Sequence, residues 1–154
     1  MVRLPTLSPK WLLVGLLALP VYFLQGKLVV ITSDSIPHRF LVKTDSAPQK
    51  GDYALFQISH ELTDEEPVTL TKKIACYAGD VLQVENRDYY CEGHYLGRAK
   101  LSSRQGAPLT PFVHNGPIPA GYAFALGEHQ DSFDSRYWGL IEIAMTERLA
   151  PLRK

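Results

Sequence analysis

The sequence has no surplus of charge of either sign, because its 154 residues include 16 basic and 16 acidic side chains. A clustered basic surplus is typical of proteins that bind nucleic acid, and a run of acidic residues is typical of a disordered, solvating tail. The balanced composition supports neither, and we expect no nucleic-acid partner. The length accommodates one domain in addition to any membrane segment.

Cysteine is scarce, with only Cys76 and Cys91 in the chain. In an oxidising compartment the two are candidates for a disulfide, and their spacing suits neighbouring strands joined through a turn. Two buried free thiols are the alternative. The spacing of ligands that indicates a zinc site is absent, so we expect neither a metal nor a cofactor.

Helical periodicity is also missing, since no segment after residue 40 sustains an apolar repeat of 3.6 residues. Short apolar and aromatic stretches bounded by turn residues occur instead, and they predict strands. The fold class expected is mainly β, an antiparallel domain with barrel-like closure. The long segment 98–120, interrupted by glycine and proline, is expected to be a connection. The predicted strands are 52–58, 68–77, 81–85 and a hairpin over 88–97, and two further apolar stretches are 122–126 and 137–145.

Charge is absent from the long apolar run Trp11–Gly26, and after Lys27 the run resumes as far as Ile31. This length matches the roughly 20 residues of a bilayer-spanning helix if the Lys27 ammonium extends to the interface. Arg3 and Lys10 precede the run, which favours a cytoplasmic N-terminus. A cleaved secretory signal is the alternative, although no small-x-small cleavage site follows the apolar core. The expected organisation is a cytoplasmic segment 1–10, a transmembrane anchor 11–31 in the lipid bilayer and an exported domain 32–154.

Ser35 follows the apolar run by four residues, and Lys72 lies within the predicted strand 68–77. Serine is a weak nucleophile unless a neighbouring base takes its proton. None of the five histidines has a recognisable triad context. A lysine can replace histidine if burial lowers its pKa from about 10.4. Alternation along the strand places Lys72 and Lys73 on opposite faces, although two solvated charges at a strand end are the alternative.

Four segments in order resemble the conserved boxes of the signal peptidase I family, which are membrane-bound Ser-Lys proteases (peptidase family S26). The resemblance covers nearly the whole chain. The chain is most similar to the conjugative-transfer branch, the TraF-type peptidases, in its short length, in its Ser-Ile-Pro spacing and in the hairpin Tyr89–Lys100. The four segments are Ser33-Asp34-Ser35-Ile36-Pro37, Lys50–Phe56, Lys72–Asp80 and Gly127–Gly139.

The resemblance implies that Ser35 is the nucleophile and Lys72 the general base. It also implies that the Ser33 hydroxyl contributes to an oxyanion hole beside the Ser35 backbone N–H. Ile36 and Phe40, near the nucleophile, are candidates either for a groove that takes small substrate side chains or for the core.

Three residues of the last box are implied to support the dyad. Ser132 corresponds to a hydroxyl that orients the lysine. Asp134 and Arg136 correspond to an acid and a base that organise the site, and a purely structural ion pair is the alternative for them.

The function implied is a membrane-anchored serine endopeptidase that removes signal or leader peptides from exported precursors, such as pilin or other conjugative-transfer proteins. Its implied place is the bacterial inner membrane, as a single-pass protein with a periplasmic catalytic domain, in association with a conjugative transfer apparatus. Two alternative functions are compatible with the same sequence: a peptidyl transferase that cyclises a pilin subunit, and a catalytically inactive scaffold of the transfer apparatus.

Overall fold

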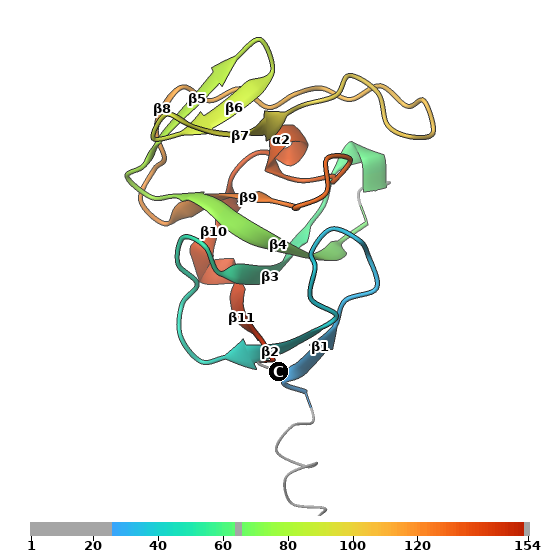
Figure 1. Cartoon of the computed structure of the whole chain (residues 1–154), viewed down its shortest axis with the longest axis vertical. Helices are drawn as coiled ribbons and strands as arrows, with labels where there is room; N and C mark the ends of the chain where they lie inside the picture. The colour runs from blue at the N-terminus through green and yellow to red at the C-terminus, as the bar shows by residue number, and fades with distance from the viewer. Residues whose placement is uncertain (1–25, 64–65, 153–154) are drawn as a thin grey trace, which may run out of the picture.

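The computed structural model describes residues 26–63 and 66–152, and their strands form two antiparallel sheets (Figure 1). The larger sheet has seven strands in the order β1-β2-β11-β3-β4-β9-β10, and the smaller has four in the order β7-β6-β5-β8. The prediction of a mainly β, antiparallel fold is confirmed. The strands are β1 Leu28–Val30, β2 Phe40–Thr44, β3 Tyr53–Ile58, β4 Val68–Tyr77, β5 Val81–Glu85, β6 Asp88–Cys91, β7 His94–Arg98, β8 Gly116–Pro117, β9 Tyr122–Leu126, β10 Ile141–Glu142 and β11 Glu147–Pro151; the short helices are η1 Glu61–Thr63, α2 Ser135–Trp138 and η2 Ile143–Met145.

The predicted barrel-like closure is wrong for the described residues. Strands β1 and β10 lie at the two ends of the larger sheet and do not pair with each other. They have three and two residues respectively, so neither offers the long hydrogen-bonding edge that closing a barrel requires. Short edges also limit unwanted pairing with other chains.

Most predicted strands agree closely with the structure, because alternation and turn residues mark their ends. The stretches 68–77, 81–85 and 122–126 are strands β4, β5 and β9, and the predicted hairpin is β6 and β7 with Glu92 and Gly93 between them. The stretch 137–145 instead divides among α2, β10 and η2. The connection 98–120 contains the two-residue strand β8.

The predicted membrane anchor lies mainly outside the described residues, as does the predicted cytoplasmic segment 1–10. The end of the predicted span needs correction, because Leu28–Val30 form β1, which pairs with β2 through Leu28 opposite Val42. Across residues 26–63 and 66–152, no helix combines the length and apolar character needed to cross a bilayer.

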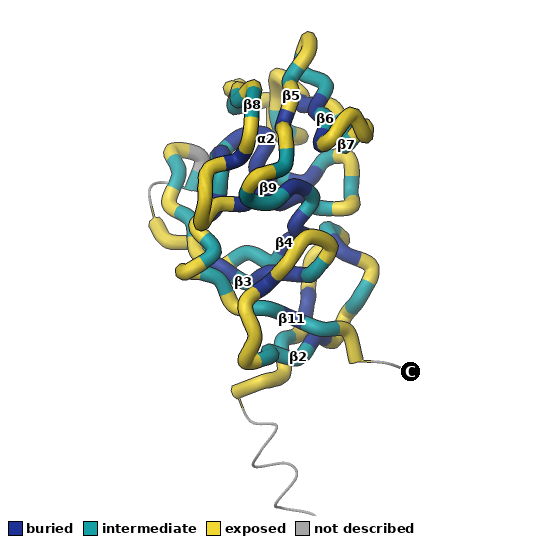
Figure 2. The backbone as a smooth tube through the Cα atoms, turned by 90° about the vertical axis from the view of Figure 1, so that its left-hand side faces the viewer, coloured by how far each residue is buried: buried dark blue, intermediate teal, exposed yellow. Residues whose placement is uncertain are grey.

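Strand β4 is the structural centre, paired with β3 on one side and β9 on the other. Alternate side chains of its second half, Lys72, Ile74 and Cys76, are buried (Figure 2). The core around Cys76 combines residues of both sheets, among them Leu82, Tyr89 and Phe124. An irregularity in β4 between Ile74 and Cys76 turns these two residues into different clusters. Lys72 lies opposite Ala54, which is buried in the same cluster as Ile74, so the lysine is held beside apolar residues.

Candidate active site

The Lys72 side chain is 4% exposed, and its amino group contacts two hydroxyl groups. Nζ lies 3.2 Å from Oγ of Ser35 and 2.6 Å from Oγ of Ser132. These three side chains come from β4, the loop before β2 and the loop before α2, so the fold assembles them from segments distant in sequence. The geometry provides a serine hydroxyl within reach of an amine that can take its proton.

Burial lowers the pKa of Lys72 from its ordinary value of 10.5, because removing the ammonium from water disfavours the charged form. The Asp134 carboxylate acts in the opposite direction, and the Arg136 guanidinium lowers the pKa further. Desolvation is the largest of these effects. The site therefore shifts the lysine toward its neutral form, which can act as a base.

Ser35 lies in a bend between β1 and β2 and is half-buried. The neighbouring Ile36 anchors this bend, because it is 5% exposed and packs in a cluster with Leu41, Tyr53 and Leu149. The backbone N–H of Glu128 donates to the Ser35 carbonyl at 2.7 Å. The bend that carries Ser35 is thus held from both sides.

Two other residues of this bend point away from the core. The Ser33 side chain is exposed, and within the described residues its hydroxyl makes no hydrogen bond. Phe40 is 52% exposed, whereas Ile36 is a core residue. Of the two candidates for a substrate groove, Phe40 alone is accessible.

Gly127 is packed closely against Ser132 and Lys72, so a larger residue would require these side chains to move. A Cβ atom at this position would lie 2.0 Å from Ser132 Oγ and 3.3 Å from Lys72 Nζ. The Gly127 backbone N–H also donates to Asp134 Oδ2 at 3.1 Å. The glycine therefore permits the short contact between Lys72 and Ser132.

Asp134 and Arg136 form a buried, bidentate ion pair. Nε of Arg136 lies 2.8 Å from Oδ1 of Asp134, and Nη2 lies 2.8 Å from Oδ2. The same carboxylate accepts from the Arg136 backbone N–H and so caps the start of α2. Arg136 also donates to the carbonyl oxygens of Arg98 and Ser132, at 2.9 Å and 3.3 Å. The pair connects α2 to the end of β7 and to the loop that carries Ser132.

Lys73, on the opposite face of β4 from Lys72, forms an ion pair with Glu128 at 3.0 Å. The Tyr53 hydroxyl donates to the same carboxylate oxygen at 3.3 Å. Burial, and secondarily the Glu128 charge, raise the pKa of Tyr53 to about 12. Glu128 thus links β3, β4 and the Ser35 bend, a role that its position in the last box did not reveal.

Cys76 and Cys91 are joined by a disulfide with a Cα–Cα distance of 5.8 Å. The bond connects β4 of the larger sheet to β6 of the smaller one. With Asp80 these two residues form a compact group of potential metal ligands, but both sulfur atoms are already bonded to each other. A disulfide sulfur is a poor ligand, because metal binding to cysteine needs the thiolate.

The structure brings together five of the six candidate catalytic and supporting residues: Ser35, Lys72, Ser132, Asp134 and Arg136 are connected by the contacts above. Ser33 lies beside them in sequence without a contact to them. Sequence reasoning missed two contributors, Gly127 and Glu128. The available signal for Gly127 was its place as the first residue of the last box, since a residue without a side chain permits close packing where side chains converge.

Comparison with known proteins identifies the family of the chain. A sequence family described as "Signal peptidase, peptidase S26" matches residues 13–147. Among solved structures, the chain is similar to a signal peptidase I from Enterococcus faecalis V583, with 21% identity, 70% of this chain and 99% of that chain covered, and a TM-score of 0.45. No curated protein matches.

Proposed function

Since the chain belongs to the signal peptidase family, peptidase S26, and is therefore a serine endopeptidase that acts on signal peptides, we propose that Ser35 and Lys72 are its catalytic dyad. The observation that carries this proposal is the 3.2 Å distance between Lys72 Nζ and Ser35 Oγ in a site that lowers the lysine pKa. A buried neutral amine beside a serine hydroxyl is a nucleophile with its general base.

In the proposed reaction, neutral Lys72 takes the Ser35 proton as Oγ attacks the peptide carbonyl. The negative charge on the carbonyl oxygen is stabilised by the Ser35 backbone N–H and by the exposed Ser33 hydroxyl, once the substrate is bound. One such donor is worth about 3 kcal/mol of barrier. Protonated Lys72 then donates to the leaving amine, and water, deprotonated by the same lysine, hydrolyses the acyl-enzyme.

Ser132 and the ion pair Asp134–Arg136 are proposed as positioning groups. Ser132 holds the lysine amine at 2.6 Å, and the rigid ion pair holds the loop on which Ser132 lies. The Asp134 charge raises the pKa of Lys72, and the neighbouring Arg136 charge acts in the opposite direction, so the pair also adjusts the protonation of the lysine.

The experiment is to express the full chain with a precursor substrate and to follow processing on gels. Ser35→Ala and Lys72→Ala should each abolish cleavage while the protein stays folded, as judged by circular dichroism. Lys43→Ala is the control, because Lys43 is a lysine on β2 whose ion pair is with Glu147, away from the contacts of Ser35 and Lys72. Processing by either dyad variant at the wild-type rate would refute the proposal.

The finer assignment is that the precursors are pilin or other conjugative-transfer proteins, processed in the bacterial inner membrane with the catalytic domain in the periplasm. The resemblance of the four boxes to the conjugative-transfer branch supports it, and the apolar run 11–26 supports the membrane location. Mass spectrometry of the processed subunit distinguishes hydrolysis from cyclisation, because a linear product contains one more water than a cyclic one.

A further inference from the structure

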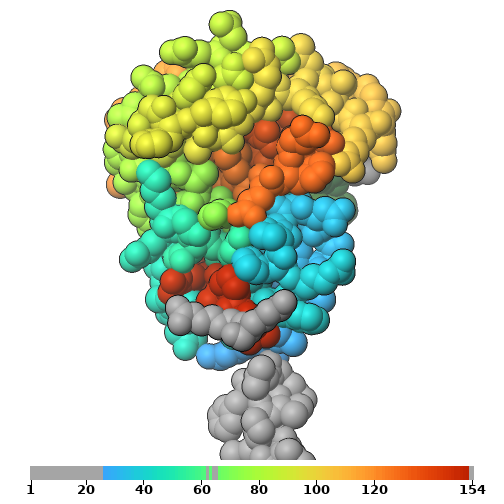
Figure 3. Space-filling view, in the orientation of Figure 1, coloured from blue at the N-terminus to red at the C-terminus, as the bar shows by residue number. Residues whose placement is uncertain are grey.

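A groove with a volume of about 480 Å³ opens beside the dyad. One wall is formed by β7 and the residues that follow it, and the other by the segment after β9. In Figure 3 the orange segment after β9 lies between the yellow residues of the β7 region and the blue segment that follows β1. We call this hollow the β7 groove; it is lined by Arg87, Tyr95–Lys100, Gly127, Glu128, Gln130 and Arg136.

The β7 groove shares two residues with the immediate surroundings of the dyad. Gly127 is packed directly against Ser132 and Lys72. Glu128 donates its backbone N–H to the Ser35 carbonyl at 2.7 Å. A chain that enters the groove is therefore continuous with the position where the scissile peptide bond must lie.

Strand β7 is an end strand of the smaller sheet, paired only with β6 among the described residues. Its residues Tyr95–Arg98 line the groove, and Tyr95 is 59% exposed. An edge strand presents backbone donors and acceptors that an extended peptide can use as an added strand. The groove thus suits a substrate segment in extended conformation.

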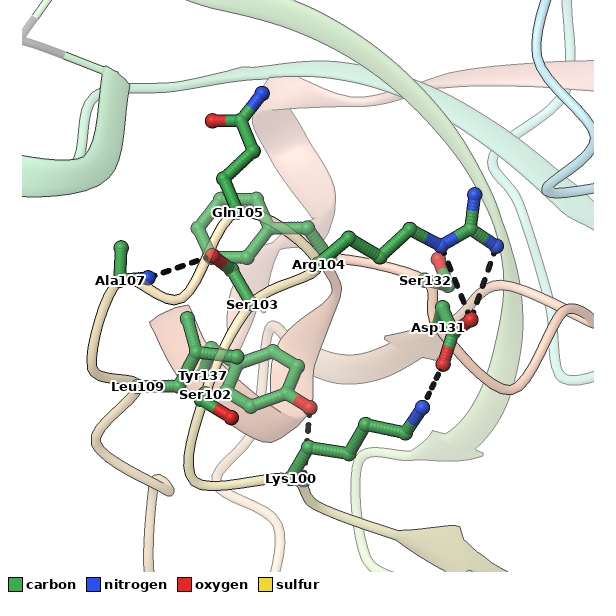
Figure 4. A pocket seen from close by; sticks show the side chains of 11 residues that line it. Lys100, Ser102, Ser103, Arg104, Gln105, Ala107, Leu109, Asp131, Ser132 and Tyr137 are labelled. Atoms are coloured by element: carbon green, nitrogen blue, oxygen red, sulfur yellow. Dashed lines mark hydrogen bonds and ion pairs between the residues drawn. The ribbon is translucent and has the colours of Figure 1, made fainter.

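The charge on this wall is positive. Arg98 forms an exposed ion pair with Asp88 at 2.7 Å. Lys100 shares a single carboxylate, that of Asp131, with Arg104 (Figure 4). Two cations on one carboxylate leave a positive charge at the end of the groove.

Of the remaining charged groups of the lining, Arg87 adds to this surplus and the other two are paired. Arg87 donates to the Ala99 carbonyl at 3.3 Å and has no ion pair within the described residues. The one carboxylate of the lining, that of Glu128, is neutralised by Lys73. The buried Arg136 is neutralised by Asp134.

Arg87 also occupies an unfavourable backbone position. It has a φ of 76° in the turn between β5 and β6, after Asn86 with a φ of 49°. In two-residue turns of this kind the second position favours glycine. A strained arginine that lines a groove suggests a functional reason for its presence.

We propose that the β7 groove binds an acidic stretch of the precursor that flanks the scissile bond and lies extended along β7. This inference rests on the proposed function, because it assigns a substrate preference to the same site. The chemistry of recognition is pairing of substrate carboxylates with Arg87, Arg98 and Lys100, combined with backbone hydrogen bonds to the edge of β7.

The test measures binding separately from cleavage. The full chain carrying Ser35→Ala is titrated in detergent with three fluorescently labelled decapeptides that alternate threonine with aspartate, asparagine or lysine, and anisotropy is recorded. We expect the order aspartate, asparagine, lysine, with the difference reduced by salt. Arg87→Gly, which relieves the turn and should retain the fold, should lower affinity for the aspartate peptide by about two- to fivefold. Arg87→Glu should favour the lysine peptide.

Lys43→Gln is the matched control, because Lys43 is a cation on β2, at the opposite end of the fold from β7 (Figure 1). It should leave the order and the affinities unchanged. Equal binding of the three peptides, absence of saturable binding, or an unchanged preference in Arg87→Gly would overturn the inference. Retention of precursor processing in Ser35→Ala, with the charge preference intact, would instead count against the proposed function alone.

Discussion

The amino group of Lys72 lies 3.2 Å from the hydroxyl oxygen of Ser35, although 37 residues separate the two along the chain. Lys72 reaches this position because β4 turns alternate side chains into the core, and Ser35 because Ile36 anchors its bend. The contact creates a base whose protonation is controlled by burial. The dependence of activity and stability on pH follows from it.

The value of kcat/KM should rise with pH through the pKa of Lys72, because only the neutral amine accepts the serine proton. The rise should lie below lysine's ordinary pKa of 10.5, since burial lowers the pKa of Lys72. A series of initial rates on a fluorogenic peptide between pH 5 and pH 11 measures it. A rate independent of pH throughout this range would contradict a lysine base.

Replacing Asp134 or Arg136 by a neutral residue should shift the pH at which activity rises, in opposite directions for the two residues. Asp134→Asn removes a charge that raises the pKa of Lys72, so the rise should move to lower pH. Arg136→Met removes a charge that lowers it, so the rise should move to higher pH. Each variant breaks a buried pair and should lose about 3–5 kcal/mol of stability. The profiles should therefore be measured at low temperature, after folding is verified.

Lys72→Met should abolish activity and stabilise the fold below neutral pH. With a folded-state pKa below the unfolded one, the unfolded chain binds more protons between the two values, so wild-type stability rises with pH across that interval. Methionine removes the cost of burying the charge, and the gain should be on the order of 1 kcal/mol or more. Urea denaturation at pH 6 and at pH 10 tests this, and a gain equal at both values would argue against it.

Gly127→Ala should strongly reduce activity, because its Cβ would collide with Ser132 Oγ and press on Lys72 Nζ. A displacement of about 1 Å at a catalytic group can cost 100-fold in rate. Ser132→Gly removes the obstructing atoms, so the double variant should recover part of the fold stability lost in Gly127→Ala. Equal stabilities of Gly127→Ala and wild type in thermal unfolding would show that the contact relaxes without cost.

Replacing both cysteines by alanine should destabilise the fold by about 3 kcal/mol, the value expected for closing a loop of this length. The disulfide spans 15 residues and connects the two sheets. Guanidinium denaturation of the variant, compared with wild type with and without reductant, measures the loss. Reduced wild type should behave like the variant, and identical curves for oxidised and reduced protein would refute the estimate.

Much of the local structure follows from the sequence. The strand Val68–Tyr77 was predicted with the ends that it has, because apolar alternation and the turn at Gly79 mark them. The strand Glu147–Pro151 was not predicted, since it is held by partners on both sides, β2 and β3, that are distant in sequence. Similarly, the larger sheet does not close into a barrel because its end strands β1 and β10 do not pair with each other, and the pattern within a strand does not predict its partners.

The sequence by itself determined the resemblance of four segments to the family boxes and the alternation that places Lys72 and Lys73 on opposite faces. It also determined that a serine and a lysine suited to a dyad are present. Only the tertiary structure decided that Lys72 is buried between two hydroxyl groups, that Gly127 leaves room for them, and that Glu128 joins β4 to the Ser35 bend. The physical reason is that a pattern reports which side of a strand a residue occupies. The pKa and the reach of that residue depend on what long-range packing places against it.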